Sequence, residues 1–366
     1  MASDQGMNLT RAAYVGRLTI KFGALFIVLM IIGRFALTAG VRLWAELNPK
    51  PPPPPTVGFG VLPQIRFAAQ GAQDKPLNYQ LDIPQSRFPT FPDRARVFLM
   101  LRSSIGLFTD QRAKEIAADY GYVFAPTVLS ETMYRWTKST PLQSTLEMDI
   151  VDLTFEIRTN YMSRADLLTN ANLPTKDDGV RLVKSFIGSG QPLPSDLATS
   201  SGEIRYLRSV GGELEEAIAV SDADFVQIDI RRAPVDGDKK FYTPQGDYGA
   251  AHAILSGVLT GRDQIVEMTF NYQSMDYAQR HTYPLRSVQS ALQIVQAGEA
   301  YVANKGLSDT AIITSIELGY YDDDQKQDYM QPIYVFRGDG GFLAYVPAIA
   351  PQWLLPPNGQ TTSSQE

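Results

Sequence analysis

Apolar positions along the chain follow three patterns, and each pattern predicts a different kind of element. Near the N-terminus the apolar residues form one nearly unbroken run. In the rest of the chain they recur either every three or four positions, which indicates amphipathic helices, or at every second position, which indicates strands with one buried face. Because both kinds of pattern are present, the sequence predicts an α+β fold that follows an N-terminal apolar helix.

The apolar run is Phe22–Val41, twenty residues that include one charged side chain, Arg34. As a helix these residues would extend about 30 Å, just enough to cross a bilayer. A central arginine costs roughly 2.5–3.5 kcal/mol on the insertion scale, whereas about a dozen large apolar residues each contribute roughly −0.3 to −0.6 kcal/mol. We therefore predict a transmembrane helix over residues 22–45, in which Arg34 snorkels to the interface, faces a partner helix or marks the end of the span.

Basic residues before this helix indicate its orientation. They are Arg11, Arg17 and Lys21. By the positive-inside rule, residues 1–21 stay in the cytoplasm and the C-terminal body is exported, so we predict a single-pass protein of the cell membrane. A cleaved signal peptide is one alternative, although Leu37 would then occupy the −3 position of a cut after Ala39, where a small residue is preferred. A buried or interfacial helix is the other.

Proline-rich and polar segments flank the body of the protein. The run Pro51–Pro55 forms a stiff polyproline II rod of roughly 3.1 Å per residue. Residues 46–56 are therefore predicted to be a spacer that holds the body away from the membrane. At the other end, residues 357–366 are polar and have the composition of a disordered tail.

Three amphipathic helices are predicted in the body, each followed by alternating stretches that predict strands. The helices are Thr109–Tyr120, Lys176–Ile187 and Val288–Ala303, with Thr109, Thr175 and Ser287 as N-caps. The strands are Thr132–Thr137, Thr145–Ile150, Asp152–Arg158, Ile204–Val210, Glu213–Val220, Phe225–Arg231, Ala311–Tyr321, Met330–Phe336 and Phe342–Val346. We therefore predict three repeated α+β units over residues 57–170, 171–282 and 283–356. The alternative is that the recurrence is fortuitous.

Turns are predicted at three places in these units. The buried parity changes between Ile150 and Leu153, which predicts a tight turn or a bulge there. The pair Gly211-Gly212 and the glycine-rich segment Gly338–Gly341 each lie between two predicted strands, so both predict hairpin turns.

Charge separates the N-terminal segment from the body. Residues 1–50 carry six basic and two acidic side chains, a net charge of +4. Since the whole chain carries −6, residues 51–366 carry −10. No contiguous Lys/Arg face recurs in this acidic body, which argues against nucleic acid as a partner.

Residues suited to catalysis or metal binding are scarce. The chain has no cysteine, which excludes disulfides, thiolate nucleophiles and Cys-ligated metals. Its two histidines, His252 and His281, lie in no nucleophile motif, and an enzyme would require a pocket that gathers one of them with carboxylates. The cluster Asp322-Asp323-Asp324 with Asp328 lacks the register of an EF-hand and predicts a solvated hairpin turn. We therefore predict no catalytic residue, no metal site and no cofactor.

The segment Pro234–Gln264 is too long to be a passive connection in a compact domain. It is predicted to be a mobile or partly helical insertion in the second unit. The alternative is a partner-binding loop that presents Phe241, Tyr242 and Tyr248, because exposed aromatic side chains are typical of interaction hot spots.

The C-terminal part of the chain resembles the last unit of the YycH/YycI family and related PepSY-like domains. The matching segments are Tyr283-Pro284-Leu285, Ala297–Tyr301, Ile316–Tyr321 and Met330–Phe336, with Tyr334 at the usual Trp position of that family. The segment Thr109–Tyr122 also looks like a helix of similar modules. The resemblance covers residues 283–349 well and 109–160 loosely. The polyproline spacer and the insertion at 234–264 depart from the pattern.

The resemblance implies a role without catalysis, in which the protein senses or restrains a partner membrane protein, often the sensor histidine kinase of a two-component system. We expect a single-pass extracytoplasmic protein that acts by protein–protein interaction, with Arg34, Phe241, Tyr242 and Tyr248 as candidate contacts. A structural subunit of a secretion, pilus or adhesion assembly is the main alternative, and an envelope enzyme or protease inhibitor is a third class. The sequence does not determine the oligomeric state.

Overall fold

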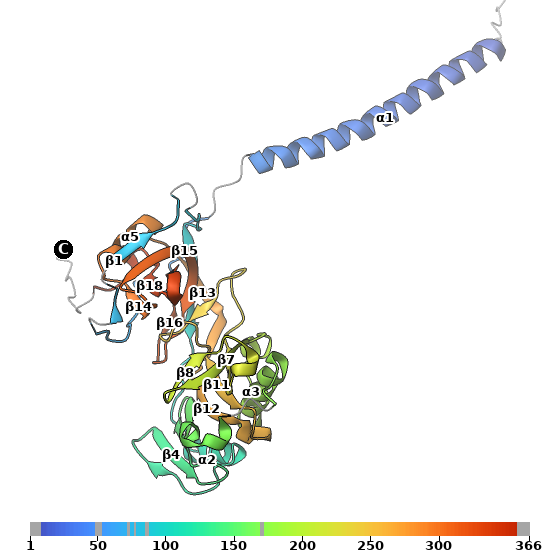
Figure 1. Cartoon of the computed structure of the whole chain (residues 1–366). Helices are drawn as coiled ribbons and strands as arrows, with labels where there is room; N and C mark the ends of the chain where they lie inside the picture. The colour runs from blue at the N-terminus through green and yellow to red at the C-terminus, as the bar shows by residue number, and fades with distance from the viewer. Residues whose placement is uncertain are drawn as a thin grey trace, which may run out of the picture. The chain divides into compact units, whose positions relative to one another are not determined.

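The computed structural model describes residues 9–47, 53–71, 74–76, 78–84, 88–168 and 172–356. The chain forms two compact units, Met1–Pro54 and Pro55–Glu366 (Figure 1). The predicted tail 357–366 lies outside the described residues, and so do residues 48–52 of the predicted spacer 46–56. Residues 53–56 of the spacer carry no regular secondary structure.

The first unit contains one long helix, α1 (Leu9–Leu47). Its segment Ala13–Trp44 is long and apolar enough to cross a membrane, and none of its apolar window is buried in the protein. The predicted span 22–45 falls almost entirely within this segment, and the lack of burial argues against a core helix. An N-terminal signal sequence can meet the same criteria of length and hydropathy, and the helix itself does not show which end faces the cytoplasm.

The second unit contains a sheet of nine antiparallel strands, in the order β3-β4-β5-β6-β12-β11-β9-β7-β8. These strands are β3 (Thr127–Val128), β4 (Met133–Lys138), β5 (Ser144–Asp149), β6 (Phe155–Thr159), β12 (Ile265–Phe270), β11 (Ala251–Ser256), β9 (Phe225–Ile230), β7 (Glu203–Val210) and β8 (Glu213–Glu216). The helices α2 (Thr109–Asp119) and α3 (Lys176–Gly190) contribute to one hydrophobic core with the strands of this sheet, so they cover the same face.

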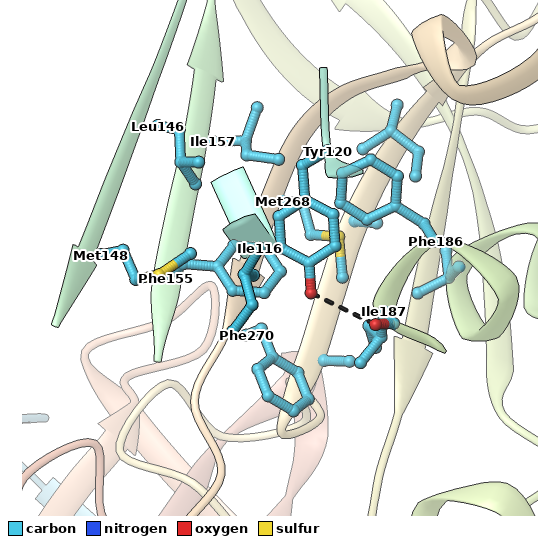
Figure 2. Packing of buried hydrophobic residues seen from close by; sticks show 14 of the residues in the cluster. Ile116, Tyr120, Leu146, Met148, Phe155, Ile157, Phe186, Ile187, Met268 and Phe270 are labelled. Atoms are coloured by element: carbon cyan, nitrogen blue, oxygen red, sulfur yellow. Dashed lines mark hydrogen bonds between the residues drawn. The ribbon is translucent and has the colours of Figure 1, made fainter. Parts of the chain in front are cut away.

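Aromatic packing holds the two helices to this face. Tyr120, which follows α2, stacks on Phe186 of α3 with ring centroids 4.6 Å apart, and its hydroxyl donates to the Ile187 carbonyl at 3.2 Å (Figure 2). Figure 2 shows these rings gathered with Phe155 and Phe270 from two adjacent parts of the sheet. The apolar side chains predicted to form the buried face of the helix Thr109–Tyr120 are therefore the ones that pack in the core.

Two further sheets complete the unit. The six-stranded sheet has the order β1-β15-β17-β18-β14, with β10 parallel to β15 on the side of β1 and α5 packed against the sheet. Its elements are β1 (Asn78–Leu81), β15 (Thr310–Tyr321), β17 (Pro332–Gly338), β18 (Leu343–Pro347), β14 (Tyr301–Asn304), β10 (Phe241–Tyr242) and α5 (Val288–Gln296). A three-stranded sheet has the order β13-β2-β16, formed by β13 (Met275–Pro284), β2 (Arg94–Met100) and β16 (Tyr329–Met330).

This topology does not show three repeated units. The nine-stranded sheet takes strands from both the first and the second predicted unit, because β6 pairs with β12 rather than ending a sheet of its own. All nine strands lie in sequence between β2 and β13, which pair with each other. The mixed α+β character is confirmed, whereas repeated PepSY-like units are not. Alternation in sequence identifies strands but not their partners, which is why the repeat could not be judged from it.

Most of the predicted local signals are confirmed. Thr175 caps α3 by accepting from the Asp178 N–H, and Ser287 caps α5 in the same way. Leu153 has φ +60° at the predicted parity change, and both Gly211 and Gly212 have positive φ in the turn between β7 and β8.

Three local predictions are wrong. Thr109 is not the N-cap of α2, since Phe108 occupies that position without a side-chain hydrogen bond. The helix predicted over Val288–Ala303 ends at Gln296, because Gly298 turns the chain at φ +73° and β14 follows. The buried Val302 therefore lies on a strand rather than on the helix stripe.

The insertion 234–264 contains two strands, and its helical part among the described residues is the four-residue 3₁₀ helix Gly261–Gln264. It supplies β10 and also β11, which lies in the middle of the nine-stranded sheet. Every residue of β11 is buried, including His252 and Ser256, so its sequence lacks the apolar–polar alternation that indicates a strand covered on one face.

Gly249, just before β11, is predicted to be indispensable to the packing of this sheet. A methyl group there would lie 2.5 Å from the backbone of Ile230, so we expect Gly249→Ala to destabilise the protein by about 1–3 kcal/mol. Gly188→Ala is the matched control, because nothing lies near that position of α3 and the change is expected to stabilise the helix by about 0.5–1 kcal/mol. Thermal unfolding of the full chain in detergent measures both, and equal shifts would contradict the packing described here.

Candidate functional site

A buried arginine joins the sheets of the second unit. Arg232 is the second residue after the end of β9, and its side chain has no solvent exposure. Its Nε donates to Asp322 at 2.8 Å, its Nη1 donates to Asp196 at 3.1 Å, and its Nη2 donates to the Gln273 carbonyl. Asp322 follows β15 of the six-stranded sheet, and Gln273 lies between β12 and β13. One guanidinium therefore binds segments from different sheets.

The surroundings of this arginine compensate its charge. Its guanidinium lies 4.0 Å from the ring centre of Tyr272, whose hydroxyl donates to Asp196 at 3.0 Å, and Tyr277 donates to the same carboxylate at 2.9 Å. Burial by itself would lower the pKa of Arg232, but the charges and hydrogen bonds of its carboxylate partners outweigh burial and raise that pKa above its usual value. The arginine is thus charged and paired at every physiological pH.

The prediction of a solvated turn at Asp322–Asp324 is wrong for Asp322. This residue is 5% exposed and forms the ion pair with Arg232. Asp323 is half-buried and Asp324 is exposed, so the cluster passes from the interior to the surface over three residues. Asp322 neutralises the buried charge of Arg232. Because Arg232 lies far away in the sequence, this role cannot be recognised from the residues next to Asp322.

A cavity of about 190 Å³ lies beside this acidic segment. Its lining comes from the segment before β11, from β11 and β12, and from the chain after β15. The lining residues are Thr243, Gln245, Tyr248, Gly249, Ala250, His252, Glu267, Thr269, Asn271, Asp322, Asp323 and Asp324. The pocket therefore gathers His252 with several carboxylates, which is the arrangement that the sequence could not reveal.

Strand register positions the histidine. His252 on β11 lies opposite Asp229 of β9 and opposite Thr269 of β12. Its neighbours Ala251 and Ala253 belong to the core under the helices, so His252 points to the other face of the sheet. On that face its ring stacks on Tyr248, with centroids 4.1 Å apart and planes 5° apart.

Asp229 determines the tautomer of this histidine. The carboxylate lies 2.9 Å from His252 Nδ1 and also accepts from the Gln227 amide at 2.6 Å and from the Gly249 N–H at 3.0 Å. Burial works against its charge, but these hydrogen bonds lower the pKa of Asp229 below its usual value. An ionised Asp229 accepts a hydrogen bond from Nδ1–H, so the proton stays on Nδ1 and the lone pair of Nε2 is left on the cavity side of the pair. Nε2 has no hydrogen-bond partner among the residues that the structure describes.

The remaining polar groups of the cavity are mainly acceptors. Glu267 accepts from the Tyr161 hydroxyl at 3.1 Å, and Asp324 accepts from the Gln245 amide at 3.1 Å. Burial and the adjacent Asp324 raise the pKa of Asp323 to about 7. In the described part of the chain no group of three His, Asp or Glu side chains could hold a metal ion. The cavity thus combines an oriented imidazole with negative charge.

Two of the four predicted contact residues are not exposed. Phe241 and Tyr242 are 2% and 1% exposed, because β10 pairs with β15 and covers them. Phe241 packs on Tyr320, and the Tyr242 hydroxyl donates to Glu317 at 2.6 Å. The expectation that they form an exposed hot spot is therefore wrong.

The other two predicted residues lie in different places. Tyr248 is 36% exposed and forms part of the cavity wall. Arg34 is exposed on α1, in the first unit. The second histidine, His281, is outside the cavity, where its Nδ1 lies 3.2 Å from the Thr56 hydroxyl and its ring packs edge-on against Phe59.

Sequence reasoning missed Asp229, Arg232 and Glu267. Asp229 occupies the polar positions of an alternating strand, where a solvent-facing side chain is the ordinary expectation. Both faces of β9 are in fact buried. The sequence feature that could have indicated this site is the presence of His252 in the insertion and of acidic residues such as Glu267 just after it.

A separate apolar groove lies next to α2. It measures about 540 Å³ and is lined by Asp110, Lys114, Ala118, Tyr122, Val123, Phe124, Ala125, Pro126, Val128, Tyr134 and Trp136. Val123, Phe124 and Val128 are 71%, 70% and 60% exposed. Lys114 and Asp110 pair at 2.7 Å within the lining. Since β3 pairs only with β4, this groove lies along the edge of the nine-stranded sheet.

Asp323 is predicted to make the protein less stable as the pH rises. Its folded pKa of about 7 exceeds its ordinary value of 3.8, so the folded state holds this proton more tightly than the unfolded state does. Its contribution to stability is therefore lost between about pH 4 and pH 7, and Asp323→Asn should remove that loss. We expect the melting temperature of the Asp323→Asn protein to exceed that of the parent protein at pH 8 and to equal it at pH 4. Melting temperatures that change with pH in the same way for both proteins would contradict the assignment.

Comparison of the chain with models of known protein families gives no match. Comparison with curated proteins gives no significant match either. The resemblance to YycH and YycI therefore stays a prediction.

Proposed function

We propose that this protein is anchored in the cell membrane by α1 and binds a partner membrane protein through the apolar groove beside α2. The observation that carries the proposal is the exposure of Val123, Phe124 and Val128 around a groove of about 540 Å³. Large side chains exposed together next to a concave surface are typical of interaction sites.

The groove favours an extended apolar segment as its occupant. Its lining is aliphatic and aromatic except for the paired Lys114 and Asp110, so it offers little to a charged ligand. The edge strand β3 adjoins it, and unpaired backbone groups at a sheet edge accept an added strand. A partner strand could then place alternate apolar side chains in the groove.

The resemblance to YycH and YycI supports a regulatory role for this binding. On that basis the partner is a membrane sensor, such as a histidine kinase, and the body lies outside the cytoplasm. Arg34 is the candidate contact for a helix of the partner within the membrane. A structural subunit of an envelope assembly remains the alternative, which the partner itself would distinguish.

The groove is predicted to capture a partner by photocrosslinking. A benzophenone amino acid at position 124 of the full chain should crosslink to one membrane protein in native membranes, and Phe124→Glu should lower co-purification of that protein about tenfold. Ile218 is the matched control, since it is 89% exposed but follows β8 at the opposite edge of the sheet. A single sensor protein supports regulation and a large multisubunit assembly supports the structural alternative. Equal capture from both positions, or none, would overturn the groove as the binding site.

The orientation of the chain is tested independently. We expect alkaline phosphatase fused after residue 356 to be active and a reporter fused before residue 9 to remain cytoplasmic, because the basic residues precede the apolar helix. Mass spectrometry of the purified protein should find the N-terminal segment still attached. A mature protein that begins after α1 would identify that helix as a signal sequence.

A further inference from the structure

The cavity that contains His252 is a second site, separate from the apolar groove. None of its lining residues is shared with that groove. Its chemistry also differs, because carboxylates and an imidazole line the cavity, whereas mainly apolar side chains line the groove. A different kind of ligand is therefore needed to explain it.

The histidine is the clearest sign that the cavity takes a ligand. His252 is 6% exposed, so its ring is largely withdrawn from bulk water. Asp229 holds Nδ1, and Tyr248 covers one face of the ring. Nε2 makes no hydrogen bond among the described residues, and it is not one of their fully buried unpaired polar atoms, so it is accessible from the cavity. It offers an acceptor to the cavity.

The carboxylates extend this acceptor character around the wall. Glu267 comes from β12, whereas Asp323 and Asp324 come from the chain after β15. Acidic groups from two different segments therefore line one cavity together with His252. The body as a whole carries −10, which also attracts a cation.

We propose that this cavity binds a guanidinium group, which donates hydrogen bonds to Nε2 of His252 and to the carboxylates of Glu267 and Asp323. A guanidinium is planar and carries five N–H donors that point in fixed directions, so it can satisfy acceptors on several walls at once. It also stacks on aromatic rings, and Tyr248 lies in the lining.

The size of the cavity limits the ligand to a fragment. Pockets for drug-sized molecules span roughly 300–1,000 Å³. A cavity of about 190 Å³ suits one side chain or a small free guanidine compound. The guanidinium could thus be carried by an arginine of a polypeptide or by a free metabolite, and the experiment separates these two sources.

Binding to the full-length protein in detergent tests the proposal by calorimetry with three probes: methylguanidinium, methylammonium and the peptide acetyl-Gly-Arg-Gly-amide. We expect methylguanidinium to bind at least tenfold more tightly than methylammonium. Binding of the peptide at least tenfold more tightly than methylguanidinium would assign the site to an arginine side chain, and equal binding of the two would assign it to a free ligand. Equal binding of methylammonium and methylguanidinium, or no binding of any probe, would overturn the proposal.

Variants locate the binding within the cavity. Asp323→Asn and Glu267→Gln each remove one wall carboxylate with little change in shape, and each should weaken methylguanidinium at least tenfold. Asp328→Asn removes the same charge four residues beyond Asp324 and outside the lining, so it should change affinity less than twofold. Thermal unfolding shows whether each cavity variant is folded. If one of the two is not, the affinity of the other for methylguanidinium tests the site. Equal weakening by Asp328→Asn would show attraction to the acidic surface only and would overturn the site.

Discussion

The ion pairs of the buried Arg232 are the interaction on which the arrangement of the body depends. A guanidinium with no solvent exposure must be neutralised, and removing a partner from such a buried pair costs about 3–5 kcal/mol. Its partners Asp196 and Asp322 come from a short helix and from the end of β15. Every element that contributes a partner is therefore held close to the end of β9. The Arg232–Asp322 pair thereby holds the end of β9 in the nine-stranded sheet to the end of β15 in the six-stranded sheet.

The same constraint creates the acidic cavity. Because Asp322 must reach Arg232, the next two residues, Asp323 and Asp324, are brought beside β11 and β12. There they meet His252, whose ring is already oriented by Asp229 across the strand register. The cavity thus lies where the chain after β15 meets residues of β11 and β12. The apolar groove, in contrast, is formed by α2, β3, β4 and the loop between α2 and β3.

Local sequence was a good guide wherever the relevant interactions are local. The cap of α3 by Thr175, the turn at Leu153 and the double-glycine hairpin each depend on residues a few positions apart, and all three were predicted correctly. The strands predicted from alternation also exist, within one to four residues at most ends. Errors arose where a strand is covered on both faces: β11 lacks the alternation of a half-buried strand, and the polar side of β9 looks like a solvent face.

The sequence by itself determined the apolar helix, the acidic body, the absence of cysteine chemistry and most helices and strands, because composition and periodicity are properties of neighbouring residues. Only the tertiary structure decided which strands pair, since register and sheet order depend on contacts between residues far apart in the chain. It also decided the roles of the aromatic and acidic residues. Phe241 and Tyr242 became core, Asp322 became an internal counter-ion, and His252 became part of a cavity, because burial and charge pairing are settled by partners more than 20 residues away.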